Sequence, residues 1–153
     1  FEDSPIDKFI TAVYGVLDTE NNTFKYVNAG HNNPYIVNPD EKKITPLITS
    51  GVMLGIIHPI EFEEDIVEIK VGEKLVIYSD GIPEAQNKAG EFFGDETLEN
   101  WLIEHSDLGA SQMMISLLDT IHNFSQGENQ SDDITIIIIE RVSGWEAQPK
   151  LFS

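Results

Sequence analysis

The hydrophobic spacing of this sequence changes twice along the chain, and this constrains the fold more than any other feature. Up to Ser79 the apolar residues form short runs of the β type, most clearly in Ile66–Val71, where apolar and charged residues alternate. Residues 95–124 follow the helical spacing, and Ile134–Glu140 returns to a strand pattern. Strands segregated from helices in this way predict an α+β fold with largely antiparallel pairing.

The strand signals predict a small set of elements. Phe9–Asp18 and Thr23–Ala29 flank a polar stretch and predict a β-hairpin. Tyr35–Val37 and Lys74–Ser79 predict two further strands, while residues 44–57 are punctuated by glycine and are predicted to be irregular. The four consecutive isoleucines within Ile134–Glu140 predict a strand that is buried on both faces.

Two helices are predicted between these strands. In the first helix, Leu98, Trp101 and Leu102 share one face, which predicts a packing role for the tryptophan. Acidic residues lie in its first turn, where the helix dipole favours them. Ser111–Phe124 predicts the second helix. Its predicted apolar stripe consists of four residues at helical spacing: Met114, Leu117, Leu118 and Ile121.

The charge of the chain limits its partners. Its 153 residues include 27 Asp and Glu against 9 Lys and Arg, a formal net charge of −18. Nucleic-acid backbones and anionic membrane surfaces both attract Lys and Arg, so we expect no nucleic-acid partner and no direct membrane contact. Divalent cations or a basic partner fit this charge. The acidic run Glu61–Asp65 is interpreted first as a solvated edge and second as a docking surface for such a partner.

Cysteine is absent from the sequence, which excludes disulfides, thiolate metal sites and cysteine nucleophiles. This composition fits a reducing compartment, and we expect a cytoplasmic location. No apolar run approaches the length that crosses a bilayer, and no secretory leader is recognisable. Because the chain starts at Phe1 and not at methionine, we expect it to be a piece of a longer protein.

Two acidic segments each lie at one end of a predicted strand. Asp80 follows the end of an apolar strand, and Asp132 and Asp133 precede the start of another. If these strands are neighbours, the carboxylates converge at one rim, where a hard cation such as Mg²⁺, Mn²⁺ or Ca²⁺ would offset their repulsion. Spacing alone favours the structural interpretation, a turn at Asp80-Gly81 and a solvated strand start at Asp132.

Three stretches of the sequence resemble signatures of one family: Leu75–Asn87 (LVIYSDGIPEAQN), Ser131–Thr135 (SDDIT) and Tyr26–Pro34 (YVNAGHNNP). Gly15–Asp18 (GVLD) and Gly51–Gly55 (GVMLG) match it in order and spacing. These motifs resemble the bacterial metal-dependent protein phosphatases of the protein phosphatase 2C-like superfamily, in its sporulation and stress-response (SpoIIE-like) branch. The resemblance covers roughly residues 9–141.

The resemblance implies an antiparallel β-sandwich flanked by helices, truncated at its N-terminus, with a phosphatase domain over residues 1–143 and an irregular extension over 144–153. It implies two Mn²⁺ or Mg²⁺ ions in the complete domain, which activate a water for attack on phosphoserine or phosphothreonine. The substrate in this branch is typically a phosphorylated anti-sigma-factor antagonist of the STAS type, and a sensor or receiver domain typically lies upstream.

Individual roles also follow from the resemblance. Asp80 and Asp132 match metal ligands of the family and are the expected catalytic residues. Asp133 is expected either to support the ligands without touching metal or to cap the following strand, and Gly81 is expected to shape the site. His31 has two interpretations, a residue that holds its loop by hydrogen bonding or a general acid for the leaving alkoxide.

One departure leaves two function classes open. The family's Gly-Gly-Asp motif, whose aspartate bridges both metals, has no counterpart before Phe9. The chain alone is therefore expected to bind metal poorly. It is either part of an active phosphatase or a non-catalytic module that binds a partner in a signalling protein. A Ca²⁺-stabilised acidic domain has only the charge in its favour, because no EF-hand-like loop is present.

Overall fold

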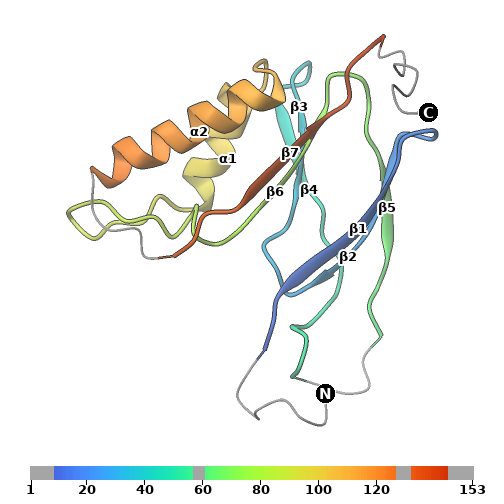
Figure 1. Cartoon of the computed structure of the whole chain (residues 1–153), viewed down its shortest axis with the longest axis horizontal. Coiled ribbons are helices and arrows are strands. Elements are labelled where there is room, and N and C mark those ends of the chain that lie inside the picture. The colour runs from blue at the N-terminus through green and yellow to red at the C-terminus, as the bar shows by residue number, and fades with distance from the viewer. Residues whose placement is uncertain (1–8, 57–60, 127–131, 145–153) are drawn as a thin grey trace, which may run out of the picture.

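The computed structural model describes residues 9–56, 61–126 and 132–144, which form two antiparallel sheets and two helices (Figure 1). The first sheet has the order β1-β2-β5 and the second the order β4-β3-β6-β7. In chain order the strands and helices are β1 Ala12–Asp18, β2 Thr23–Ala29, β3 Tyr35–Asn38, β4 Lys43–Pro46, β5 Asp65–Glu68, β6 Lys74–Tyr78, α1 Asp95–Glu104, α2 Ala110–Ser125 and β7 Ile136–Glu140. The predicted α+β sandwich is confirmed.

The predicted hairpin is present as β1 and β2, which pair from Ala12 opposite Ala29 to Asp18 opposite Thr23. Its turn is closed by the Asp18 carboxylate, which accepts hydrogen bonds from the backbone N–H groups of Glu20 and Asn21, both at 2.9 Å. The Asn21 side chain also donates to this carboxylate at 2.7 Å. These bonds hold the pKa of Asp18 below its ordinary value, the side-chain bond having the largest effect.

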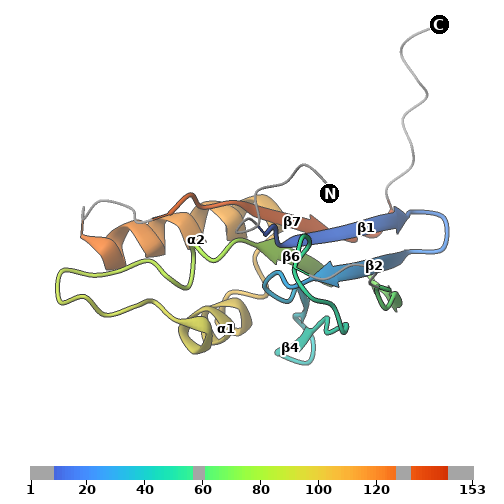
Figure 2. The same cartoon turned by 90° about the horizontal axis from the view of Figure 1, so that it is seen from below.

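The second sheet separates two hydrophobic cores, because successive side chains of a strand point to opposite faces. On β6, Val76 and Tyr78 face the helices, while Leu75 faces the first sheet and packs near Phe24 and Tyr26 of β2. Figure 2 shows α1 and α2 on the same side of the molecule, away from β1 and β2. The four-stranded sheet is thus the middle layer, and its strand ends are fixed from both sides.

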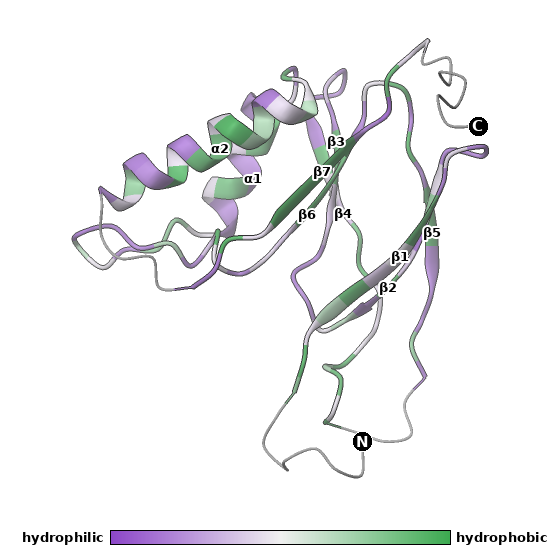
Figure 3. Cartoon of the chain, in the orientation of Figure 1, coloured by the Kyte–Doolittle hydropathy of each residue, from purple (hydrophilic) through white to green (hydrophobic). Residues whose placement is uncertain are grey.

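The helices pack on this middle layer through narrower stripes than the sequence predicted. Figure 3 shows hydrophilic and hydrophobic residues alternating along α2. Its buried residues are Met113, Leu117 and Ile121, so Leu117 and Ile121 are buried as predicted, whereas Leu118 is exposed and Met113 takes the place predicted for Met114. Trp101 is buried as predicted, and its Nε1 donates to Thr120 Oγ1 at 3.1 Å. Within the described residues, neither helix is long and apolar enough to cross a bilayer.

Two strand predictions need correction. Ile134–Glu140 was predicted to be buried on both faces, but β7 is the edge strand of its sheet as described, and Ile137 is 49% exposed. Part of the stretch predicted to be irregular forms β4, which pairs with β3 although its own sequence is largely polar. The predicted domain division after residue 143 stays a prediction, since residues 145–153 lie outside the described part of the chain.

Candidate metal centre

The two acidic segments lie at one end of the second sheet. Strands β6 and β7 pair antiparallel, with Tyr78 opposite Ile136. Asp80 follows the end of β6 and Asp132 precedes the start of β7, so the antiparallel register brings the two segments side by side. The two strands are thus neighbours, which is the condition on which the expected convergence of the carboxylates depended. We call this end, with residues 79–84 and 132–135, the acidic rim.

Ser79 joins the two segments of the acidic rim. Its backbone N–H donates to the Thr135 carbonyl at 3.0 Å, and its hydroxyl donates to the Asp133 carbonyl at 3.0 Å. The same hydroxyl accepts from the Thr135 N–H at 2.9 Å. These three bonds extend the pairing beyond the last ladder residues. Sequence reasoning missed Ser79, because a serine before an Asp-Gly pair has the composition of an ordinary turn.

Gly81 allows close approach of the backbones at the acidic rim. A Cβ built on this residue would lie 2.5 Å from the Asp133 carbonyl oxygen and 3.3 Å from that of Asp132. The Asp80 carbonyl accepts the Glu84 N–H at 2.9 Å, which turns the chain sharply after β6. The predicted role of Gly81 in shaping the site thus has a physical basis.

The side chains at the acidic rim have the chemistry of a hard-cation site. Asp80, Asp132 and Asp133 are all exposed, and carboxylate oxygens are the ligands that Mg²⁺ and Mn²⁺ prefer. Asp132 Oδ1 accepts the Asp133 N–H at 2.7 Å, and Asp133 holds Ser79 through its carbonyl. Among the described residues no group of three or more His, Asp or Glu has a metal-site arrangement. The donor type fits a metal, and the acidic rim supplies two of the predicted ligands.

His31 lies in the loop between β2 and β3, which reaches the same end of the sheet because Tyr35 at the start of β3 pairs with Val76 near the end of β6. Its Nδ1 is 3.1 Å from the hydroxyl oxygen of Thr11, and its backbone N–H and carbonyl both bond the side chain of Asn28. These contacts agree with a residue that belongs to a fixed loop. The general-acid interpretation stays untested.

Two tyrosines lie directly behind the acidic rim. The rings of Tyr35 and Tyr78 are stacked with centroids 5.7 Å apart, and the Tyr78 hydroxyl is 3.4 Å from that of Tyr35, which donates to Glu99 Oε1 at 2.8 Å. Burial is the main cause that raises the pKa of both hydroxyls above the ordinary range. They therefore stay neutral and act as hydrogen-bond donors and acceptors in the core between the second sheet and α1.

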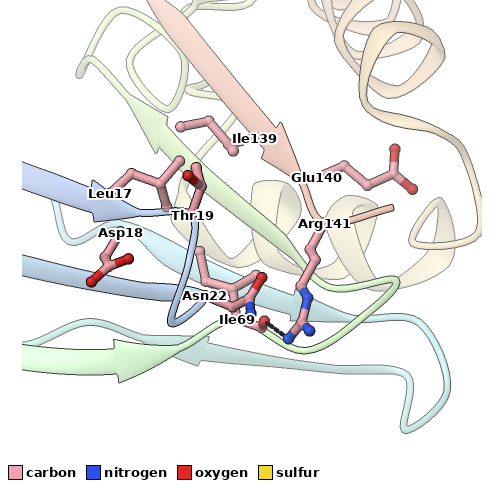
Figure 4. Close-up of a pocket in the computed structure, with 8 residues that line it drawn as sticks. All are labelled: Leu17, Asp18, Thr19, Asn22, Ile69, Ile139, Glu140 and Arg141. Carbon is pink, nitrogen blue, oxygen red and sulfur yellow. Dashed lines mark hydrogen bonds between the residues drawn. The ribbon is translucent and has the colours of Figure 1, made fainter. Parts of the chain in front are cut away.

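A small pocket lies at the other end of the sandwich (Figure 4). It has a volume of about 110 Å³ and opens between the end of β1 and the end of β7, where Leu17 and Ile139 form apolar walls. Arg141 closes one side and donates through Nη1 to the Ile69 carbonyl at 2.8 Å. Asp80 and Asp132 do not line it, because the acidic rim lies at the opposite strand ends.

Known sequences resemble this chain over most of its length. The family described as Stage II sporulation protein E (SpoIIE) matches residues 1–142. Protein IcfG of Synechocystis sp. is 32% identical over 133 residues, which are 87% of this chain and 21% of that protein. RsbU of Bacillus subtilis, named a phosphoserine phosphatase, is 26% identical over 87% of this chain and 39% of its own length. The chain spans well under half of either relative.

Solved structures share the fold. The SiaA-PP2C domain of Pseudomonas aeruginosa superposes with a TM-score of 0.71 at 19% identity, over 85% of this chain and 51% of that one. The phosphatase domain of SpoIIE from Bacillus subtilis, presoaked with Mn, gives a TM-score of 0.63 at 17% identity, over 90% of this chain and 59% of that one. The sandwich is thus the PP2C-like fold, and the chain covers part of it.

Proposed function

The chain belongs to the SpoIIE family, and from that membership we propose that it forms part of a metal-dependent phosphatase domain that hydrolyses phosphoserine or phosphothreonine in a protein. The observation that supports the proposal is the antiparallel pairing of β6 and β7, whose ends carry the segments of Asp80 and Asp132 to the same rim. Both belong to the motifs that carry the family resemblance. Relatives that are named phosphoserine phosphatases, RsbU and RsbP of Bacillus subtilis, support the same reaction.

In this proposal Asp80 and Asp132 hold Mn²⁺ or Mg²⁺ through their carboxylate oxygens. Such ions lower the pKa of a water and offset negative charge on the phosphoryl oxygens. Gly81 and Ser79 keep the two ligand segments at a fixed spacing, and Asp133 contributes through the carbonyl that Ser79 bonds. Two ligands are few for a pair of ions, and the described residues hold no metal-site group of three or more such side chains, so the proposal includes a further carboxylate ligand.

The proposed substrate is a phosphorylated regulatory protein of the STAS type in the cytoplasm, and the proposed neighbour is an upstream sensor or receiver domain. Both follow from the family branch and from the longer relatives, of which this chain matches 21% to 39%. The number of ligands also favours a second candidate. With only two of the predicted ligands at the acidic rim of the described residues, the domain could bind a phosphoprotein without hydrolysing it, as a pseudophosphatase.

The test uses the protein produced from its complete reading frame, with p-nitrophenyl phosphate and Mn²⁺. Asp80→Asn and Asp132→Asn should each abolish Mn²⁺-dependent hydrolysis and leave the circular dichroism spectrum unchanged. Asp119→Asn, which changes an exposed carboxylate on α2, is the matched control and should keep wild-type turnover. Near-normal turnover in either rim variant would refute the ligand assignment. A wild-type protein that is folded but inactive would favour the pseudophosphatase.

A further inference from the structure

Asn28, at the end of β2, is a buried polar residue that the predicted function does not use. It is 3% exposed, and its side chain makes three hydrogen bonds. The Oδ1 atom accepts the His31 N–H at 2.8 Å, and Nδ2 donates to the His31 carbonyl at 2.9 Å and to Asn33 Oδ1 at 3.1 Å. One side chain therefore fixes the backbone of the loop over residues 30–34.

The same residue also holds a second loop. Its backbone N–H donates to Thr49 Oγ1 at 3.0 Å. A Cβ on Gly51 would lie 1.9 Å from the Asn28 carbonyl oxygen, and one on Gly30 would lie 2.7 Å from Met53 Cγ. The GVMLG stretch over residues 51–55, predicted to be irregular, is thus packed tightly on the AGHNN stretch. Asn28 lies where these two loops meet.

The loop over residues 30–34 is joined to the strand that carries Asp80. The Asn32 side chain lies beside the hydroxyl of Tyr78, two residues before Asp80. Tyr35, directly after the loop, pairs with Val76 on the same strand and stacks on Tyr78. A displacement of this loop therefore acts on the end of β6 through Tyr35, both by strand pairing and by ring stacking.

We propose that Asn28 is a positioning residue for the acidic rim: by fixing the loop over residues 30–34 against β6, it sets the place of Asp80 relative to Asp132. The inference rests on the proposed function for its catalytic consequence. A buried amide suits this role because leaving any of its partners unpaired is costly, so the loop has one favoured position. Residues that orient metal ligands typically change metal affinity or activity by about 10- to 100-fold.

The experiment compares Asn28→Ala with Asn38→Ala in the complete protein. Asn38 is a matched control at the opposite end of β3, where its side chain donates to Glu73 Oε1 at 2.8 Å and accepts the Glu41 N–H at 2.9 Å. We expect Asn28→Ala to raise the Mn²⁺ concentration for half-maximal hydrolysis by about tenfold or more and to lower kcat, with little change in KM. Asn38→Ala should lose thermal stability without this shift.

A third variant, Asn28→Ser, distinguishes loss of the positioning role from simple unfolding. Its hydroxyl can accept the His31 N–H as the asparagine does, so its Mn²⁺ requirement should fall between wild type and Asn28→Ala. Equal shifts in Asn28→Ala and Asn38→Ala, or a wild-type Mn²⁺ requirement in Asn28→Ala, would overturn the proposal.

Hydrogen exchange separates this inference from the proposed function. The N–H groups of Ile82 and Glu84 donate to the carbonyls of Ser79 and Asp80 and report on the segment that carries Asp80. Faster exchange there in Asn28→Ala, but not in Asn38→Ala, supports the positioning role even if the wild-type protein proves inactive. Unchanged exchange in both variants would refute it whatever the activity.

Discussion

Replacing Gly81 with alanine tests whether backbone contact sets the spacing of the two candidate ligand segments. The new Cβ would lie 2.5 Å from the Asp133 carbonyl oxygen, while ordinary van der Waals contact begins at 3.4 Å, so about 0.9 Å of space is missing. The opposing atoms are backbone atoms and cannot rotate away as the end of a side chain can. The segments around Asp80 and Asp132 must therefore move apart.

The size of the effect follows from this overlap. Gly81 does not have a positive φ, so alanine adds no backbone strain, and the cost is that of overpacking, about 1–3 kcal/mol. For a chain of this length each kcal/mol lowers Tm by about 2–4 °C, which gives a fall of about 2–12 °C. Separation of the carboxylates by several tenths of an ångström should also raise the Mn²⁺ concentration that hydrolysis requires.

Thermal unfolding followed by circular dichroism measures the first effect, and hydrolysis of p-nitrophenyl phosphate over a Mn²⁺ series measures the second. Gly109→Ala is the control, because its nearest contact would be Glu140 Oε2 at an ordinary 3.6 Å. If Gly81→Ala matched the control in both Tm and Mn²⁺ requirement, the spacing would not depend on this contact, and the reasoning would be wrong.

Two further predictions concern stability. The Lys74 side chain is 2% exposed, and its Nζ donates to the Ser106 carbonyl at 2.9 Å and lies 3.7 Å from Glu140 Oε1. Lys74→Met leaves the Glu140 carboxylate without this partner, so we expect the free energy of unfolding in urea to fall by about 3 kcal/mol. Lys25→Ala breaks the exposed ion pair with Glu64 and should lower the free energy of unfolding by less than about 1 kcal/mol. An equal loss of stability in Lys74→Met and Lys25→Ala would contradict the expected difference between a buried and an exposed lysine. Burial, reinforced by the Asp65 carboxylate, raises the pKa of Tyr26 from the ordinary 10.0 to about 12. Because the unfolded chain loses this proton first, stability is unaffected below about pH 10 and falls as the pH rises to about 12. In Tyr26→Phe the urea midpoint should therefore decrease less between pH 10 and pH 12 than in the wild type. The same decrease in both proteins would show that another group is responsible.

Sequence reasoning predicted the elements whose signal is local. The hairpin of β1 and β2, the two helices and the strand before Asp80 all have a clear hydrophobic period or a polar turn, and each is present. The placement of Asp80 and Asp132 at strand boundaries was also visible. Their meeting required only that β6 and β7 be neighbours, which two apolar strands of similar length favour.

The errors have a common cause, which is that burial depends on neighbours distant in the sequence. Ile137 has the same local sequence as Ile138, but β7 is an edge strand as described, and no periodicity shows which strand occupies an edge. The stretch of β4 is a strand because β3 offers it partners, not because its residues favour one. The role of Asn28 was missed because its burial also depends on distant residues, while locally an asparagine near a glycine has the appearance of a turn residue.

The candidate centre therefore contains two kinds of residue: those proposed to bind the metal and those that hold these ligands in place. Carboxylates at the acidic rim repel one another and are exposed, so nothing in their own interaction holds them at the spacing a cation needs. Neutral contacts supply that spacing: the three bonds of Ser79, the missing side chain of Gly81 and the buried amide of Asn28. Substitution of these neutral residues should change metal affinity without removing a ligand, whereas substitution of Asp80 or Asp132 should remove the site itself. Measuring both classes of variant in one Mn²⁺ series separates position from chemistry, because only the first class should be rescued by excess metal.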